Sequence, residues 1–298
     1  MIKKIKRVLN SPLLILVHLF DRKPFCYLMS DRNWLRMMFY AYHHRKLNLD
    51  NPQTFNEKLQ WLKLYDRKPE YRMMSDKFAV RRFVAEEIGE EHLIPLLGVW
   101  DSVDDIDFDS LPNQFVLKCN HDSAGLVVCK DKTKLDVEKT KCKLKRCLKR
   151  DYFWASREDN YRVAQKKILA EKYMTDGDKD DLTDYKFYCF NGVPKFVQID
   201  MNRYTNHVDK YYDMAWNEIP VDWGCGLSPS LSVCKPECFE DMKSIAEQLS
   251  KNLLHVRVDL YLISGKIYFG ELTFHSGGGC VKVNPISYDY EWGTYLNI

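Results

Sequence analysis

The sequence predicts an α+β fold with a helical N-terminal extension. Helical periodicity dominates the chain up to residue 113, whereas short strand patterns, several of them joined as hairpins, begin at residue 114. A length of 298 residues with 45% apolar residues is enough for a core of two or three packed subdomains. The chain contains no internal repeat that would indicate a solenoid or propeller.

Charge and cysteine content exclude several classes of protein. The formal charge of +3 is far from that of a dedicated nucleic-acid binder, so we expect no nucleic-acid partner. Ten scattered cysteines without a C-x-x-C pair predict reduced thiols in a cytoplasmic protein. Cys225, Cys234 and Cys238 lie between His207 and His255, but this spacing fits no common zinc pattern.

The first 50 residues are expected to form a basic and apolar helical extension. Cations alternate with bulky apolar side chains through residues 2–9, and an apolar run follows from Pro12 to Phe20. That run is shorter than the roughly 20 residues of a membrane span, and no small-residue cleavage site follows it. Residues 1–20 are therefore expected either to lie on an anionic membrane surface, at its inner face, or to dock on the body of the protein.

Residues 51–113 should form a helical region that leads into the fold. Thr54 and Glu57 make a capping box, which predicts a helix from about 55 to 66. A second helix is expected from about 70 to 88, where Gly89 ends it. A short connection then runs through Pro95 to Trp100.

Strand patterns and two further helices follow. In chain order we expect a strand hairpin at 114–119 and 126–130, a helix from Asp136 to about 150, strands at 168–174 and 185–191, a hairpin turn at Asn191-Gly192, and a helix at 237–252. The helix after Asp136 is strongly basic. Such a face is usually only solvated, and the alternative is a binding surface for a polyanionic substrate or a membrane.

The most informative stretch is the hairpin at 255–274. Arg257 and Asp259 share one face of its first strand, and Glu271 and Thr273 share one face of its second. A three-residue turn at 264–266 would set Asp259 opposite Glu271 and Arg257 opposite Thr273. A two-residue turn would slip the register by one and put Glu271 on the other face.

Two carboxylates directly opposite each other repel unless a cation compensates them. Oxygen-only ligands suit magnesium that is shared with substrate phosphates better than they suit zinc. The alternative is an Arg257 salt bridge to one acid, with the other acid in solvent.

A lysine next to a small-residue loop offers a place for those phosphates. The chain has neither a P-loop nor a G-x-G-x-x-G motif, which argues against P-loop NTPases, Rossmann domains and protein kinases. Lys118 ends a strand, and the loop 120–125 follows directly. A lysine in this position can pair with phosphate oxygens while the amides of the loop cover them.

From about residue 52 to residue 298 the chain resembles the ATP-grasp superfamily, and specifically its TupA-like (teichuronopeptide-biosynthesis) family. The resemblance rests on six motifs in one order: TFNEKLQWLKLYDR, DKFAVRRFVAEEIGEEHLIPLLGVW, FVLKCNHDSAG, ILAEKYM, DYKFYCFNG and VRVDLY...GKIYFGELTF. It implies two α+β subdomains that clasp ATP, with the lid hairpin and hinge strand at 114–174 and the metal and acceptor site at 175–298.

The resemblance also implies roles for individual residues. Lys77 and Lys118 would reach ATP phosphates, and the lid would include His121, Ser123 and Gly125. The hinge strand, whose backbone reads adenine and whose acid can bind ribose, would be Glu171, Lys172, Tyr173 and Met174.

In the second half of the chain the resemblance implies the reaction centre. Arg257 would steady an acyl-phosphate intermediate, and Lys186 is a further candidate for binding phosphate. Asp259 and Glu271 match the magnesium ligands. Thr273 stands where the family has an asparagine as third ligand, and its shorter hydroxyl weakens the case for a second Mg²⁺.

The function implied by the resemblance is an ATP- and magnesium-dependent carboxylate-amine ligase. It would join an amino acid or peptide to a sugar acid or amino group of a bacterial surface polysaccharide or its precursor. The acceptor would sit near the loop 275–279, with Arg203 and Asp213 as contributors. Two alternatives remain: a glycosyltransferase of capsule or O-antigen biosynthesis that uses a nucleotide-sugar, and a non-catalytic nucleotide-binding adaptor held at the membrane.

Overall fold

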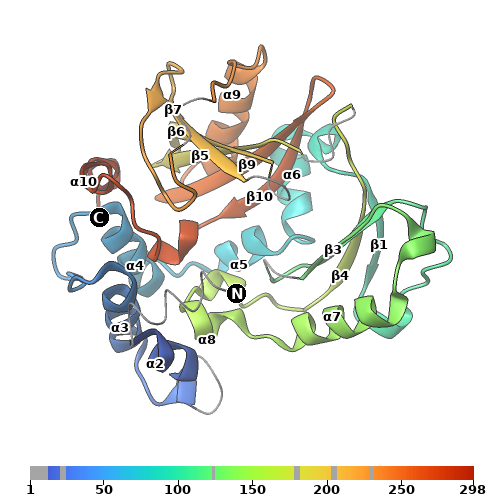
Figure 1. The fold of residues 1–298 in the computed structure, drawn as a ribbon, viewed down its shortest axis with the longest axis horizontal. Coiled ribbons are helices and arrows are strands. Elements are labelled where there is room, and N and C mark those ends of the chain that lie inside the picture. Colours follow the sequence, from blue (N-terminus) through green and yellow to red (C-terminus); the bar gives the residue numbers. More distant parts are fainter. Residues whose placement is uncertain (1–12, 21–24, 123–124, 178–181, 203–206, 228–230) are drawn as a thin grey trace.

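Two antiparallel sheets, each with helices packed on it, make up most of the molecule (Figure 1). The computed structural model describes residues 13–20, 25–122, 125–177, 182–202, 207–227 and 231–298. No helix within these ranges is both long enough and apolar enough to cross a membrane.

The smaller sheet has the strand order β1-β4-β2-β3. Its strands are β1 (Leu96–Trp100), β2 (Phe115–Cys119), β3 (Leu126–Cys129) and β4 (Ile168–Lys172). The basic helix α7 (Val137–Lys149) begins after Asp136, which caps it as expected, and buries Leu144 against this sheet.

Strand β1 was not predicted, and it lies before residue 114, within the region expected to be helical. Gly98 interrupts its pattern, and the ladder with β4 shifts register between Leu96 and Gly98. A Cβ at Gly98 would stand 2.4 Å from the Trp100 ring, so any other residue there would displace that ring. A glycine inside so short a strand removes the alternation from which strands are recognised.

The larger sheet has the strand order β10-β9-β5-β6-β7-β8. Its strands are β5 (Asp184–Phe190), β6 (Val193–Met201), β7 (Val208–Asp213), β8 (Glu218–Ile219), β9 (His255–Ile263) and β10 (Lys266–Thr273). One face is apolar and packs on α9 (Phe239–Ser250) and α6 (Val80–Ile88). The other face carries Lys186, Arg257 and Asp259.

The helix expected at 70–88 is in fact two helices, α5 (Pro69–Ser75) and α6. The break is at Asp76, whose backbone is extended and whose carboxylate accepts from the Phe78 and Ala79 N–H groups. Its other oxygen accepts from the buried Asn120 amide at 2.7 Å. The apolar periodicity continues across the break, so the sequence pattern alone does not reveal it.

The N-terminal helices form a separate layer at one side (Figure 1). Helix α2 (Leu13–Phe20) buries Leu14 and Val17 against α3 (Asp31–His43), so this part of the extension docks on the protein. The amphipathic pattern at residues 2–9 lies outside the described residues. Helix α4 (Phe55–Tyr65) begins with the expected capping box.

The remaining short elements connect these layers. They are η1 (Phe25–Tyr27), η2 (Glu90–His92), η3 (Val103–Asp105), η4 (Lys132–Lys134), α8 (Tyr152–Ser156), η5 (Asp159–Tyr161), η6 (Ser276–Gly279) and α10 (Ser287–Thr294).

Candidate functional site

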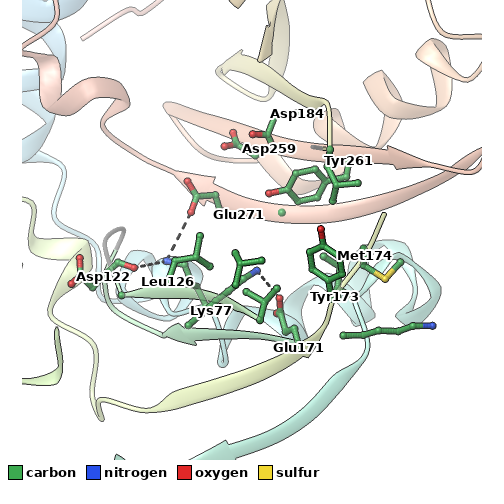
Figure 2. Close-up of a pocket in the computed structure, with 18 of the residues that line it drawn as sticks. Lys77, Asp122, Leu126, Glu171, Tyr173, Met174, Asp184, Asp259, Tyr261 and Glu271 are labelled. Atoms are coloured by element: carbon green, nitrogen blue, oxygen red, sulfur yellow. Dashed lines mark hydrogen bonds and ion pairs between the residues drawn. The ribbon is translucent and has the colours of Figure 1, made fainter. Parts of the chain in front are cut away.

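A cavity of about 330 Å³ lies between the two sheets (Figure 2). This volume is at the lower end of the range for small-molecule pockets, roughly 300–1,000 Å³. Side chains from both sheets point into it. Of the residues proposed from the sequence, those that line it are Lys77, Lys118, Gly125, Glu171, Lys172, Tyr173, Met174, Lys186, Arg257, Asp259 and Glu271.

The β9–β10 hairpin brings the two expected metal ligands opposite each other. Its turn has only two residues, 264 and 265, so the expected three-residue turn was wrong. The ladder then shifts register at Gly270, where a β-bulge adds one residue, and Glu271 pairs with Asp259. The expected pairing is therefore confirmed, although the bulge and not the turn produces it.

Gly270 itself borders the cavity. A Cβ on this residue would stand 3.0 Å from the Asp259 carbonyl oxygen and 3.1 Å from the Tyr261 ring. A side chain at the bulge would therefore force its neighbours to shift by a few tenths of an ångström.

Arg257 binds both acids of this pair. Its guanidinium donates to both oxygens of Asp259 at 2.6 Å and lies 3.4 Å from Glu271 Oε1. It also donates to the Thr273 hydroxyl at 3.0 Å, which in turn donates to Glu271. The Asp259 side chain is buried, whereas 40% of the Glu271 side chain is exposed. The salt-bridge alternative is therefore met only in part, because Arg257 pairs with Asp259 but also contacts Glu271, which is only partly exposed.

The two acids differ in their electrostatic environment. Burial raises the pKa of Asp259 to about 6, although Arg257 and Lys186 oppose the shift. Burial would also raise the pKa of Glu271, but Lys77 and Arg257 outweigh it and the pKa is lowered. Neighbouring carboxyl groups whose pKa values are shifted in opposite directions are typical of functional sites.

Lys77 reaches the cavity from the break between α5 and α6. Its Nζ donates to the Asp122 carbonyl at 3.2 Å and lies 3.9 Å from Glu271 Oε2 (Figure 2). Its backbone N–H donates to the carbonyl of Asn120, at the base of the lid loop. The break therefore places a cation between the two sheets.

Lys118 lies on the cavity side of the smaller sheet with Glu171. Its Nζ is 2.5 Å from Glu171 Oε2, and Arg81 approaches the other oxygen at 3.4 Å. The Glu171 carboxylate thus contacts two cations, so it orients Lys118 within the cavity wall.

Lys186 faces the cavity from the centre of the larger sheet. Its ammonium donates to Asp184 and Asp200 at 2.8 Å each. It is directly opposite Asp259 on the neighbouring strand, which extends the polar face of β9 and β10 onto β5.

The proposed lid and hinge residues divide into two groups. Lys172, the last residue of β4, lines the cavity together with Tyr173 and Met174, which follow it. His121 is buried and is not among the lining residues, so it does not join the others at the cavity wall. Ser123 lies outside the described residues.

The loop at 275–279 does not border this cavity. Lys63 and Gln60 of α4 donate to its backbone carbonyls at 2.7 to 3.0 Å. The Asp213 carboxylate accepts from the backbone of its own turn. Arg203 is not among the described residues.

Several cavity residues were missed from the sequence, among them Asp184 and Tyr261, which are paired across β5 and β9. Asp184 could have been found, because it is two residues before Lys186 and alternation puts both on one face. The role of Asn120, which joins the lid base to Asp76, depends on a contact between residues 44 positions apart and leaves no local signal.

The donor set for a metal is small. Among the described residues, no group of three or more His, Cys, Asp and Glu side chains converges as a metal site. The cysteines and histidines between residues 207 and 255 therefore do not form such a group either. Asp259 and Glu271 supply two carboxylates, which matches the way magnesium is held when substrate phosphates and water complete its coordination.

Comparison with solved structures gives distant similarities to ligases. The chain is similar to the D-alanine–D-alanine ligase of Bacillus anthracis complexed with ATP, at 16% identity and a TM-score of 0.41, over 68% of this chain and 54% of that one. It is also similar to the Helicobacter pylori D-alanine–D-alanine ligase, at 12% identity and a TM-score of 0.40, over 81% and 69%. The chain thus spans about half the length of the Bacillus ligase. No curated protein matches it.

The decisive comparison is with protein families. The family model described as TupA-like ATPgrasp matches residues 57–297. This range contains both sheets and every described residue of the cavity wall. The chain therefore belongs to the TupA-like ATP-grasp family, and its two antiparallel sheets form the ATP-grasp fold.

Proposed function

We propose that this protein is an ATP-dependent carboxylate-amine ligase that works through an acyl-phosphate intermediate. One observation carries the proposal: a single cavity between the two sheets gathers Lys77, Lys118 and Lys186 with the Asp259–Glu271 carboxylate pair, from segments far apart in the chain. Family membership supports the use of ATP.

Three ammonium groups would hold the triphosphate. Lys118 comes from the smaller sheet, Lys186 from the larger sheet and Lys77 from the helix break. Their charges would offset the negative charge that develops on the transferred phosphoryl group, and the sheets would hold the reactants in line. Tyr173 and Met174, which follow β4 in the proposed hinge, would lie along the adenine.

Magnesium fits the oxygen donors of Asp259 and Glu271, and when bound it would neutralise charge on the phosphates. Thr273 is engaged by Arg257 and Glu271, so it contributes less as a third ligand. Arg257 is placed beside the pair and would steady the phosphate of the acyl intermediate.

In the proposed reaction, a carboxylate oxygen of one substrate attacks the γ-phosphorus of ATP, and ADP leaves. An amine of the second substrate then attacks the acyl carbon, releases phosphate and loses one proton, which leaves an amide. The β2–β3 hairpin covers the cavity from one side and would keep water from the intermediate.

For the substrates, we propose an amino acid or short peptide and a sugar acid or amino sugar of a bacterial surface polysaccharide or its precursor, in the cytoplasm. The family's link to teichuronopeptide biosynthesis supports this choice. The cavity does not extend to the loop 275–279, so the cavity does not support the placement of the acceptor near that loop.

The test is a panel of amino acids with uronic acids and their nucleotide-linked forms, read out by ADP and phosphate release. We expect ADP release that requires both an amine and a carboxylate. Release of UDP from a nucleotide-sugar would instead support the glycosyltransferase. Nucleotide binding without turnover on any pair would support the adaptor.

A further inference from the structure

An exposed apolar segment lies between α2 and α3. Phe25, Tyr27 and Leu28 have exposed fractions of 39%, 55% and 74%, whereas Cys26 between them is fully buried. Ile15, on the outer side of α2, is 57% exposed. A cluster of large apolar groups held in water is unfavourable and usually marks an interaction surface.

This segment is firmly anchored to its neighbours. The buried Arg157 donates to the Cys26 carbonyl at 2.9 Å and pairs with Asp31 at 3.0 Å. The Tyr27 ring packs edge-on against Trp154 of α8, with ring centroids 4.5 Å apart. The contacts of Arg157 and Trp154 therefore fix the backbone of this segment while its apolar side chains remain exposed.

The basic helix α7 ends three residues before α8 begins, and Trp154 of α8 contacts Tyr27 of this segment. In Figure 1, α2, α8 and α7 follow one another along the lower edge. The exposed cations of α7 include Lys139, Lys145 and Lys149, whereas Glu138 is its exposed acid and the exposed Asp136 and Asp151 flank the helix. In the described part of the chain, no carboxylate pairs with Lys139 or Lys149; Lys145 pairs with Asp104.

We propose that residues 25–28 and helix α7 together dock this protein on an anionic lipid bilayer. Aromatic and aliphatic side chains insert at the boundary between headgroups and acyl chains, while lysines a short distance away bind anionic headgroups. Charge complementarity favours a membrane because the apolar and basic features adjoin. A soluble polyanion would bind only the lysines of α7 and would leave the apolar residues 25–28 exposed to water.

The test is flotation of the full chain with vesicles of phosphatidylcholine mixed with phosphatidylglycerol, and with vesicles of phosphatidylcholine alone. Tyr27→Ser with Leu28→Ser should lower partition onto both vesicles by about tenfold, because less apolar surface is inserted. Lys139→Gln with Lys149→Gln should lower partition onto the anionic vesicles by about fivefold per cation and leave the neutral vesicles unaffected.

Matched controls come from the other half of the molecule. Leu227→Ser removes an apolar side chain that is 59% exposed. Lys251→Gln with Lys266→Gln removes two exposed cations of the larger-sheet region. These controls should float like the parent chain, and all variants should keep the parent's melting temperature to within a few degrees.

Two results would overturn the proposal. In the first, both docking variants still bind vesicles and only removal of residues 1–12 abolishes binding. That result would assign membrane binding to residues 1–12. The other is a chain that ignores vesicles but binds a soluble anionic polysaccharide through the α7 lysines, which would assign the basic surface to a polymer.

Discussion

At the scale of the residue, the cavity is a set of cations already held by carboxylates. Lys118 is paired with Glu171, Lys186 with Asp184 and Asp200, and Arg257 with Asp259. Nucleotide phosphates would have to share these cations with the acids. Because the acids keep the ammonium groups oriented before any ligand arrives, little ordering is left for binding.

Replacing Lys118 tests this arrangement. Lys118→Ala should weaken ATP binding by about 10- to 100-fold, because a charge-assisted hydrogen bond contributes about 1.5–3 kcal/mol. It also leaves Glu171 with Arg81 alone. Calorimetric titration with ATP measures the change, and Lys134→Ala, at an 83% exposed side chain, is the control. An unchanged dissociation constant would remove Lys118 from the phosphate site.

The carboxylate pair makes a separate prediction. Asp259→Asn with Glu271→Gln keeps the shape of both side chains, and Thr273 can still accept from Arg257, so the chain should still fold, with a lower melting temperature because the buried guanidinium loses both counter-charges. ADP release should fall by at least 100-fold, and the dependence of nucleotide binding on Mg²⁺ should disappear. Thermal melting and magnesium titration check the two parts. Full turnover in this double variant would refute the metal assignment.

At the scale of the element, the β-bulge in β10 sets the geometry of the site. The two-residue turn alone would have placed Gly270 opposite Asp259, and the inserted residue restores the polar face to Glu271. A bulge also increases the local twist of the strand, which re-aims the side chains that follow it.

Gly270→Ala therefore should damage the site more than it damages the sheet. The new methyl group meets the Asp259 carbonyl at 3.0 Å, and forcing such a contact costs about 1–3 kcal/mol. We expect a lower melting temperature and a larger loss of ATP affinity. Lys266→Ala, exposed on the same strand, is the control. A Gly270→Ala variant with the parent's affinity for ATP would show that the bulge tolerates a side chain.

The sequence predicted those elements that are stabilised by residues close together in the chain, and it missed those that depend on distant residues. The α4 capping box lies within four residues and was predicted correctly. The break at Asp76 was not, because Asn120 and the lid loop stabilise it from a distance. The Asp259–Glu271 pairing was predicted within one hairpin. The Lys118–Glu171 contact needs two strands that meet only in the folded sheet.

At the scale of the whole molecule, two histidines, the partly buried His43 and the buried His255, join the N-terminal layer and the C-terminal half. His43 at the end of α3 donates to the Gly279 carbonyl at 3.0 Å. His255 on β9 packs against Phe55 of α4 and contacts the Cys189 carbonyl at 2.9 Å. Burial lowers the pKa of His43 to about 4 and that of His255 to about 3.

These shifts predict that acid destabilises the assembled molecule. Below pH 6.5 the unfolded chain protonates both histidines while the folded chain does not, so the free energy of unfolding falls as the pH falls toward 4. The slope is about 1.4 kcal/mol per pH unit for each histidine. Buried Asp209, Asp259 and Asp289 have raised pKa values, mainly through burial, and act in the opposite direction.

A comparison of variants separates the two effects, because the aspartates are common to all chains. Urea unfolding of the parent and of His43→Gln with His255→Asn should be measured between about pH 7 and pH 4.5, the range over which the unfolded histidines titrate. The double variant should be less stable at neutral pH, yet its free energy of unfolding should fall less steeply, by up to about 2.7 kcal/mol per pH unit. Parallel curves for the two chains would show that these histidines protonate equally in the folded and unfolded states, and that the acid sensitivity arises elsewhere.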